Sequence, residues 1–313
     1  MDSKKLMDYK VDEAMELFVL LKNSDARVAK NGKRFLSITF EDESGEISGM
    51  YWDANDADVA AFVPGKVVKL NGKRELYQGK AQVKIQKLRL ATDSEPNDPS
   101  YFVPHAPEKR KSIQEEIETF LFDITEPTWN RIVRNLLQKH GEAFYTYPAA
   151  KTNHHAYAGG LSFHTLSILR LAKAVVNEYP GINAPLLYAG AILHDIGKTT
   201  ELSGPVSTQY TTTGNLLGHI SIIDGEIVSA CDELKFDPQG QAVVLLRHMV
   251  LSHHGLMEYG SPVPPHMLEA EILHHLDEMD ASIMMVQNAL KNTPNGQFSE
   301  RIFGLDNRTF YKE

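Results

Sequence analysis

Histidine is concentrated in one part of this sequence. Eleven of the thirteen histidines lie between residues 154 and 275. Imidazole binds divalent metals and exchanges protons near neutral pH, so the cluster indicates a metal centre or a proton-transfer site. The informative strings are Gly159-Gly-Leu-Ser-Phe-His164, Leu193-His-Asp-Ile-Gly-Lys198, Gly218-His219, Ser252-His-His-Gly255 and His274-His-Leu-Asp-Glu-Met-Asp-Ala281.

The adjacent pair His194 and Asp195 restricts the geometry further. Neighbouring residues cannot share one helical face, so both reach one centre only at a helix end, which we expect Gly197 to supply. There, the carboxylate of Asp195 can bridge two cations while His194 binds one. Mixed imidazole and carboxylate donors favour Mn²⁺, Fe²⁺ or Zn²⁺ over Mg²⁺ alone, and the lack of thiolates argues against a structural zinc.

The order of these strings resembles the HD phosphohydrolase superfamily over about residues 150–290, with Gly-Gly-Leu before the first histidine and Gly-Lys after the His-Asp pair. The resemblance implies metal ligation by His164, His194, Asp195 and Asp277, with Asp280 as the alternative to Asp277. It also implies two divalent cations, Mn²⁺ first and Fe²⁺, Co²⁺ or Zn²⁺ as alternatives. The second cation would be held with the help of His219, His253 and His254.

The same resemblance implies roles in phosphodiester hydrolysis. Two cations can lower the pKa of a bridging water and hold the attacking and leaving oxygens, with Asp195 at the bridge. Lys198 is expected to neutralise charge on the scissile phosphate, although a lysine there could simply cap a helix. His155 and Tyr157 precede the first ligand and are expected near the cleaved nucleotide. The predicted catalytic residues are Asp195, Lys198 and His155.

Residues 1–92 are expected to form a five-stranded OB-type barrel, because strand patterns alternate with turns and one short helix precedes the fourth strand. Eight basic residues against one acid within residues 66–89 favour contact with a polyanion. About half of the aromatic residues could instead fill the barrel core. The predicted nucleic-acid contacts are Lys33, Arg34, Phe35, Trp52, Lys73, Arg74, Tyr77 and Lys84.

Helical periodicity follows a proline-rich stretch. Residues 93–112 contain four prolines and no periodic pattern, which predicts a linker. Residues 113–295 are expected to form an all-α HD domain, and residues 296–313 a tail of unassigned structure. The chain is therefore expected to be a multi-domain α+β protein. Helices are expected near residues 161–178, 184–195, 218–233, 241–253 and 267–291.

Charge and cysteine content indicate which ligands the chain can bind and in which compartment it works. The net charge of −9 hides an asymmetry, because residues 1–92 carry a net +2 and the remainder a net −11. Any polyanion should therefore meet the N-terminal domain first. One cysteine, Cys231, predicts a reducing compartment. Without a signal-like or membrane-length apolar stretch, we expect a cytoplasmic protein that does not bind membranes.

A basic OB-type domain ahead of an HD domain, with Asn153-His-His-Ala-Tyr-Ala-Gly-Gly-Leu161 leading in to the first HD histidine, is similar to the bacterial YhaM-type exoribonucleases. The resemblance implies metal-dependent 3′–5′ hydrolysis of single-stranded RNA to nucleoside monophosphates, with single-stranded DNA as a second candidate substrate and a homo-oligomer left open. Two alternatives are a nucleotide or cyclic-dinucleotide phosphohydrolase and a non-catalytic DNA-binding accessory protein of replication. The extended basic domain argues against the first, and the complete ligand set against the second.

Overall fold

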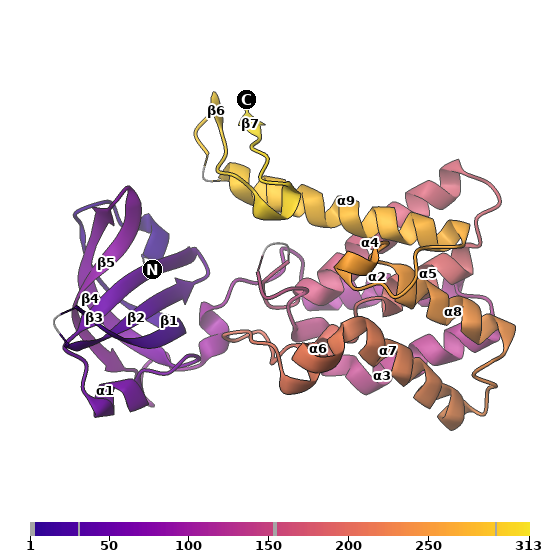
Figure 1. The fold of residues 1–313 in the computed structure, drawn as a ribbon, viewed down its shortest axis with the longest axis horizontal. Helices are drawn as coiled ribbons and strands as arrows, with labels where there is room; N and C mark the ends of the chain where they lie inside the picture. Colours follow the sequence, from indigo (N-terminus) through magenta and orange to yellow (C-terminus); the bar gives the residue numbers. More distant parts are fainter. Residues whose placement is uncertain (1–3, 31, 153–154, 292) are drawn as a thin grey trace. The chain divides into compact units, whose positions relative to one another are not determined.

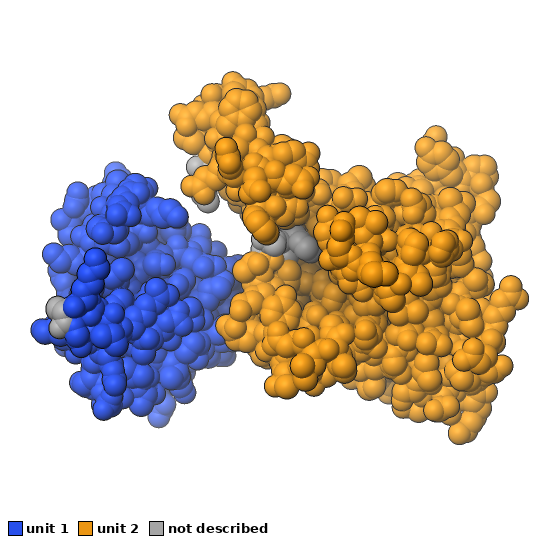
Figure 2. All heavy atoms as spheres, in the orientation of Figure 1, with its two compact units in different colours: residues 1–105, 205–207 blue, residues 106–204, 208–313 orange. Residues whose placement is uncertain are grey.

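The computed structural model describes residues 4–30, 32–152, 155–291 and 293–313. It divides into two compact units (Figure 2), one reaching His105 and including Pro205–Ser207, the other formed by the rest of the chain from Ala106. Each unit has its own hydrophobic core. The barrel and the helical bundle confirm the predicted multi-domain α+β class.

Five strands of the first unit close into a barrel in the order β1-β2-β3-β5-β4 (Figure 1). Neighbours pair antiparallel except β3 and β5, which pair parallel. The helix α1 (Asp56–Ala61) separates β3 from β4, as the OB order requires. The strand bounds are β1 (Ala14–Val28), β2 (Arg34–Asp42), β3 (Gly45–Trp52), β4 (Val67–Tyr77) and β5 (Lys80–Leu90).

Alternation of side chains decides which face of each strand is available for binding. In β2, Leu36, Ile38 and Phe40 are buried in the barrel core, so Phe35 between β1 and β3 points outward. The long strand β1 pairs with β4 through its first half and with β2 through its second half. Its register shifts between Leu21 and Asn23, where the strand passes from one partner to the other.

The predicted linker is divided between the two units. Residues 93–105 belong to the barrel unit, where the 3₁₀ turn η2 (Pro99–Phe102) contacts β1 and β2. Helix α2 then begins at Arg110, slightly before the predicted helical start at residue 113. The second half of the stretch therefore already belongs to the helical unit.

The helical unit packs around α5 (Ala184–Leu193), whose residues from Leu186 to Leu193 are all buried. A helix that is apolar on every side belongs in the middle of a bundle, where each face finds a partner. Figure 1 shows the surrounding helices. They are α2 (Arg110–Asp123), α3 (Pro127–Thr146), α4 (Gly160–Glu178), α6 (Lys198–Glu201), α7 (Thr212–Leu234), α8 (Gln241–Ser252) and α9 (Leu268–Lys291).

The end of the chain, left unassigned from sequence, forms a small hairpin after α9. Its strands β6 (Gln297–Phe298) and β7 (Tyr311–Lys312) pair antiparallel around the 3₁₀ turn η4 (Phe303–Leu305). A further 3₁₀ turn, η3 (Met257–Tyr259), follows α8. Within the described ranges, no helix is both long and apolar enough to cross a membrane.

Candidate metal centre and nucleic-acid surface

Helices from across the second unit direct histidine and aspartate side chains into one buried centre. The segments that meet there lie far apart in the sequence, as the ordered strings predict. Five of the seven side chains are buried, and His254 and Asp277 are partly exposed. In chain order the contributors are His164 in α4, His194 and Asp195 after α5, His219 in α7, His253 and His254 after α8, and Asp277 in α9.

The turn after α5 requires glycine, but for a different reason than predicted. The helix ends at Leu193, before the His194–Asp195 pair, so Gly197 does not end it. The backbone of Gly197 is ordinary right-handed helix, with φ −56°. A Cβ atom on Gly197 would lie 2.3 Å from the carbonyl oxygen of His219. The glycine therefore permits the close packing that brings Asp195 near His219.

A second glycine places His219. Gly218 has φ 70° and ψ 151°, which interrupts α7 directly before the histidine. This conformation favours glycine because a Cβ atom makes it strained. The interruption frees the backbone N–H of His219, which donates to Oε1 of Glu201 at 3.1 Å. The predicted helix start at residue 218 corresponds to this kink within α7.

Asp195 lies at the middle of the centre. Its Oδ2 atom is 3.4 Å from Nε2 of His194 and 3.6 Å from Nε2 of His164. Its Oδ1 atom is 3.4 Å from Nε2 of His219 and 3.8 Å from Nε2 of His253. Bonds of about 2.1 Å place neighbouring ligands of one metal about 3.0–3.4 Å apart. The spacing around each oxygen is therefore close to that of a metal position.

Several buried polar atoms of this centre make no hydrogen bond to the described part of the chain. They include Nε2 of His194, His219 and His253, and Oδ1 of Asp195. Buried polar atoms without partners are rare in folded proteins, and bound divalent metal would satisfy them. Imidazole and carboxylate donors also match first-row divalent metals. The residues thus fit a divalent cation, and the cluster indicates divalent metal binding.

The two aspartates of α9 lie on opposite sides of the His164 ring. Asp277 Oδ1 is 3.1 Å from Nε2, the nitrogen that also faces Asp195. Asp280 Oδ2 is 2.7 Å from Nδ1, at the rear of the ring. Burial opposes charge on His164, but its hydrogen bonds with both aspartates raise its pKa to about 9. This geometry favours Asp277 over Asp280 as the ligand.

Three further donors are held in the charge states that metals bind. Burial keeps the pKa of His253 and His254 below the ordinary histidine value, so both rings are neutral. Burial also opposes ionisation of Asp195, but Lys198 and His194 outweigh it and hold the pKa of Asp195 well below its usual range. Neutral imidazole and ionised carboxylate are the ligand forms.

A cavity of about 260 Å³ opens beside the centre. Lys198 borders it and is 9% exposed, and its Nζ atom donates to Oδ2 of Asp195 at 2.6 Å. The predicted phosphate contact of Lys198 stays a prediction, and this position at the cavity is compatible with it. The other lining residues are Ala149, Ala150, Lys151, Glu201, Leu202, Tyr210, His219, His254, Asp277, Glu278 and Ala281.

His155 lies behind the centre. It is only 1% exposed, and its Nε2 atom is 2.7 Å from Asp280 while its Nδ1 atom is 2.7 Å from the hydroxyl of Tyr157. A contact with the cleaved nucleotide, as predicted, needs an accessible nitrogen, and this placement provides none. The preceding residues of the predicted lead-in string, Asn153 and His154, lie outside the described residues.

On the barrel, Phe35 and Trp52 form an aromatic pair on the outer face of β2 and β3. They are direct cross-strand partners with ring centroids 4.8 Å apart, and Trp52 is 57% exposed. Arg27 in β1 is the cross-strand partner of Phe35 on the other side. Arg27 is absent from the predicted contacts, because only the strand register places it beside Phe35. Arg27, Phe35 and Trp52 are called the aromatic row below.

Most of the predicted cationic contacts share ion pairs. Lys33 pairs with Asp53 and Lys73 with Asp12, each at 2.8 Å, and Arg34 pairs with Asp56. These pairs are exposed, and exposed pairs contribute only about 0–1 kcal/mol, so a phosphate can replace the carboxylate. Lys84 makes no ion pair with any described residue and stands directly opposite Lys73. Tyr77, beside the β4–β5 turn, is 57% exposed.

Arg74 differs from the other predicted contacts. Its guanidinium donates to the backbone carbonyls of Tyr9 at 2.6 Å and Met7 at 3.1 Å. These bonds tie the N-terminal segment, including η1 (Leu6–Asp8), to the barrel. The predicted phosphate contact of Arg74 is not supported by this arrangement, since the side chain already has a structural role.

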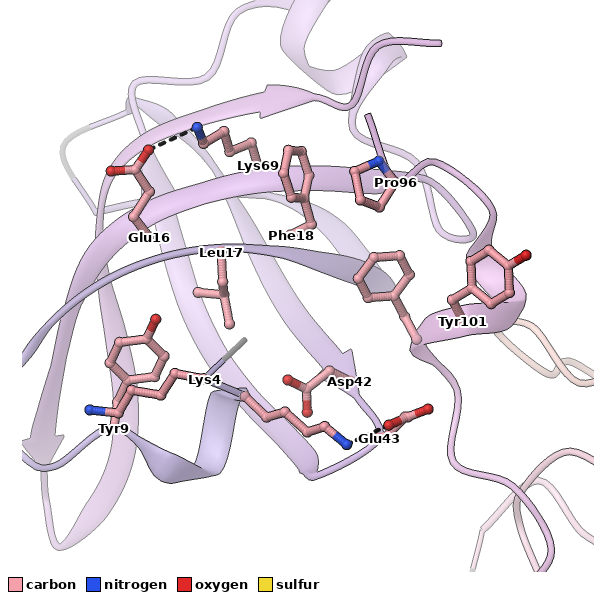
Figure 3. A pocket seen from close by; sticks show the side chains of 12 residues that line it. Lys4, Tyr9, Glu16, Leu17, Phe18, Asp42, Glu43, Lys69, Pro96 and Tyr101 are labelled. Atoms are coloured by element: carbon pink, nitrogen blue, oxygen red, sulfur yellow. Dashed lines mark hydrogen bonds and ion pairs between the residues drawn. The ribbon is translucent and has the colours of Figure 1, made fainter. Parts of the chain in front are cut away.

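The barrel unit also has a cavity of about 540 Å³ beside β1 (Figure 3), and its lining residues include no member of the aromatic row. Phe18, Tyr101 and Phe102 line it together with Lys69. Its lysines are matched by carboxylates, for example Lys69 with Glu16 at 2.8 Å. Exposed pairs of this kind also hold Lys33 and Arg34, so ion pairing does not separate the two sites. The exposed aromatic pair makes the face of β2 and β3 the better candidate for a nucleic-acid strand.

Comparisons with known proteins agree with both units. Residues 20–91 match an OB-fold nucleic acid binding domain, and residues 161–282 match an HD domain. Proteins named 3′-5′ exoribonuclease YhaM from Listeria monocytogenes serotype 4b and Listeria welshimeri serovar 6b are each 49% identical over 308 residues, 98% of this chain and of theirs. The protein of that name from Listeria innocua serovar 6a is 48% identical over the same share. The chain belongs to the YhaM family.

Proposed function

We propose that this protein is a metal-dependent 3′–5′ exoribonuclease that hydrolyses single-stranded RNA to nucleoside monophosphates. The observation that carries the proposal is the convergence of buried, unbonded Nε2 atoms on the carboxylate of Asp195. Such a centre suits metal-assisted hydrolysis, and a single-strand-binding fold shares the chain with it. The 3′–5′ polarity comes from the names of the relatives.

The proposed centre holds two divalent cations, with Mn²⁺ as the preferred ion. One position would use His164, His194, Asp277 and Oδ2 of Asp195. The other would use His219, His253, His254 and Oδ1 of Asp195. The grouping follows the distances around Asp195. Donor atoms of Asp195, His219, His253 and His254 also lie within 4.8 Å of one another, as do those of His164, His194 and Asp195. The mixed nitrogen and oxygen donors support Mn²⁺, with Fe²⁺, Co²⁺ and Zn²⁺ as alternatives.

When bound, the cations would lower the pKa of a water molecule and offset charge on the attacked phosphate. Asp195 would hold both positions at a fixed separation through its two oxygens. Lys198 donates to Asp195 at 2.6 Å and borders the cavity, so a small rotation would carry its ammonium group to a phosphate oxygen. There it would offset the charge that develops during hydrolysis.

The barrel would bind the single strand upstream of the cleaved end. Bases would stack on the aromatic row, while Lys33, Lys84 and the exposed ring of Tyr77 would contact the backbone and further bases. Faces of strands 2 and 3 and the β4–β5 loop are the usual ligand surface of this fold. Stacking does not distinguish ribose from deoxyribose, so single-stranded DNA should bind the barrel as well. A single buried cysteine suits a reducing, cytoplasmic setting.

The test follows a 5′-labelled single-stranded RNA longer than the site of about 4–16 nucleotides of an OB fold. The substrate is incubated with Mn²⁺ and either the unaltered protein or the Asp195→Ala variant. We expect a ladder of progressively shorter labelled products, which the variant does not form. Intact RNA with both proteins, together with retained RNA binding, would replace the nuclease proposal with the accessory-protein alternative. Release of the labelled 5′-terminal nucleotide as the only labelled product would show that the protein degrades RNA from the 5′ end instead.

A further inference from the structure

The rear nitrogen of every proposed imidazole ligand has a hydrogen-bond partner. Three of the rings use backbone carbonyls. His194 Nδ1 donates to Ala191 at 2.8 Å, His253 Nδ1 to Val250 at 2.6 Å, and His254 Nδ1 to Tyr259 at 2.6 Å. A carbonyl only accepts, so the proton must sit on Nδ1 and the Nε2 lone pair faces the centre.

The other two rings use carboxylates instead. His164 Nδ1 lies 2.7 Å from Oδ2 of Asp280, and His219 Nδ1 lies 3.2 Å from Oε1 of Glu201. A carboxylate accepts the same hydrogen bond but adds a negative charge, which makes the imidazole a stronger electron donor. His164 and His219 belong to different proposed metal positions. Each position therefore has one ring supported by a carboxylate.

Resting on the proposed two-metal centre, we infer that Asp280 and Glu201 are positioning residues, each of which sets the affinity of one metal position. Asp280 would act on the position of His164, and Glu201 on the position of His219. Neither carboxylate would touch substrate through this role. Both would fix the angle and protonation of a ligand ring.

Asp280 is well placed for this role because it joins several groups. Besides His164, its carboxylate accepts from Ser167 Oγ and is bonded to His155 Nε2. His155 in turn bonds Tyr157 and has a left-handed backbone with φ 47°. A strained residue persists only where its surroundings hold it. Asp280 thus also ties the segment before α4 to the His164 ring.

Glu201 fixes His219 at two points. Its Oε1 atom accepts from the backbone N–H at 3.1 Å and from the ring at 3.2 Å. The backbone bond exists because Gly218 interrupts α7 just before the histidine. Ring and backbone are therefore aligned by a single carboxylate, which is itself buried. The strings that contain the proposed ligands do not reveal this role of Glu201, because Glu201 lies 18 residues before His219.

The test titrates Mn²⁺ into the chelator-treated full-length protein by calorimetry. We expect two binding steps for the unaltered protein. Asp280→Asn should weaken one step by about 10–100-fold, the range for lost supporting partners of metal ligands, and Glu201→Gln should weaken the other. The matched control is Glu226→Gln, which alters a carboxylate bonded to His140, outside the proposed ligands. Both Mn²⁺ steps should be unchanged in the control.

Two outcomes separate the inference from the proposed function. Unchanged binding steps in Asp280→Asn and Glu201→Gln, with two steps and RNA hydrolysis in the unaltered protein, would overturn the inference alone. Absence of Mn²⁺ binding by the unaltered protein would overturn the two-metal centre itself. Melting in chelator checks that each variant folds. If Asp280→Asn does not fold, Glu201→Gln alone tests the inference. General destabilisation is not expected to weaken only one of the two Mn²⁺ binding steps.

Discussion

The two units present their functional residues in opposite ways. In the helical unit most of the proposed donors are buried, and hydrogen bonds at the rear of each ring fix their direction. On the barrel the candidate contacts are exposed, as in Trp52, and most cations share surface ion pairs. Metal binding needs atoms in fixed places, whereas an RNA of any sequence needs accessible rings and charges. The helical unit therefore has the fixed geometry that hydrolysis needs, and the barrel has the exposed side chains that substrate binding needs.

The largest effect expected from this contrast follows metal removal. Dialysis against chelator should lower turnover on RNA by about a thousandfold or more, since metal ions contribute several kcal/mol and each 1.36 kcal/mol is tenfold. RNA affinity in a gel shift should change little, because every cluster of possible metal donors found among the described residues lies in the helical unit. Added Mn²⁺ should restore turnover. Loss of RNA binding on chelation would mean that the metal centre also holds most of the substrate.

Changes in the aromatic row are expected to weaken RNA binding and to leave turnover nearly unchanged, the opposite of metal removal. Replacing both Phe35 and Trp52 by alanine should raise KM for RNA by about thirtyfold or more with little change in kcat, since stacking contributes about 1–3 kcal/mol per base and two stacking rings are lost. The matched control is Tyr101→Ala, an exposed aromatic residue on η2 of the same unit. Steady-state kinetics on an oligonucleotide separates the two constants. A fall in kcat without a change in KM would place the row at the cleavage step.

The convergence of the candidate ligands could be predicted from sequence largely because they occur in short strings near helix ends. His194 and Asp195 are informative as a pair, since only a helix end lets both face one point. The supporting residues could not be predicted in this way. Glu201 and Asp280 act through the rear of a ring, and that relation depends on how α6, α7 and α9 pack. Gly197 was predicted to end a helix, whereas its lack of a side chain permits close packing.

The barrel was predictable as a fold but less so as a surface. Alternating strands identify the OB order, yet residue type does not tell which lysines are already engaged. Arg74 and Lys84 look equivalent in sequence, but Arg74 bonds backbone carbonyls and Lys84 pairs with no carboxylate in the described chain. Arg27 joins Phe35 only through the strand register. Sequence therefore predicts the charge of the domain better than its contacts.

A smaller effect concerns pH in the metal-free protein. The pKa of His164 is raised from its ordinary value of 6.5 to about 9 in the folded state, so its protonated form stabilises the fold. This contribution is fully present below pH 6.5 and is lost as pH rises through 9. The melting temperature of the helical unit in chelator should therefore fall as the pH rises from 6.5 to 9. The barrel strands contain no histidine, so they serve as the internal reference.

Saturating Mn²⁺ should remove most of this pH dependence, because the cation replaces the proton on the His164 ring. His164→Gln should remove it even in chelator. A melting temperature of the metal-free helical unit that stays constant from pH 6.5 to 9 would contradict a protonated His164. An equal shift in the barrel would assign the effect to something other than this histidine.

The smallest effect tests which barrel face carries the phosphates. Lys73 and Lys84 stand directly opposite each other across β4 and β5, and like charges in that position destabilise a sheet. Asp12 already pairs with Lys73, whereas Lys84 has no carboxylate partner in the described chain, so a phosphate is expected at Lys84. Lys84→Ala should therefore lower the slope of log affinity against log salt by about 0.7, the value for one phosphate contact on a single strand. Lys69→Ala, which removes a lysine paired with Glu16 beside the other cavity, should leave the slope unchanged. Equal slopes for both variants would mean that the strand does not distinguish the two faces, and the aromatic row would then hold bases without directing the backbone.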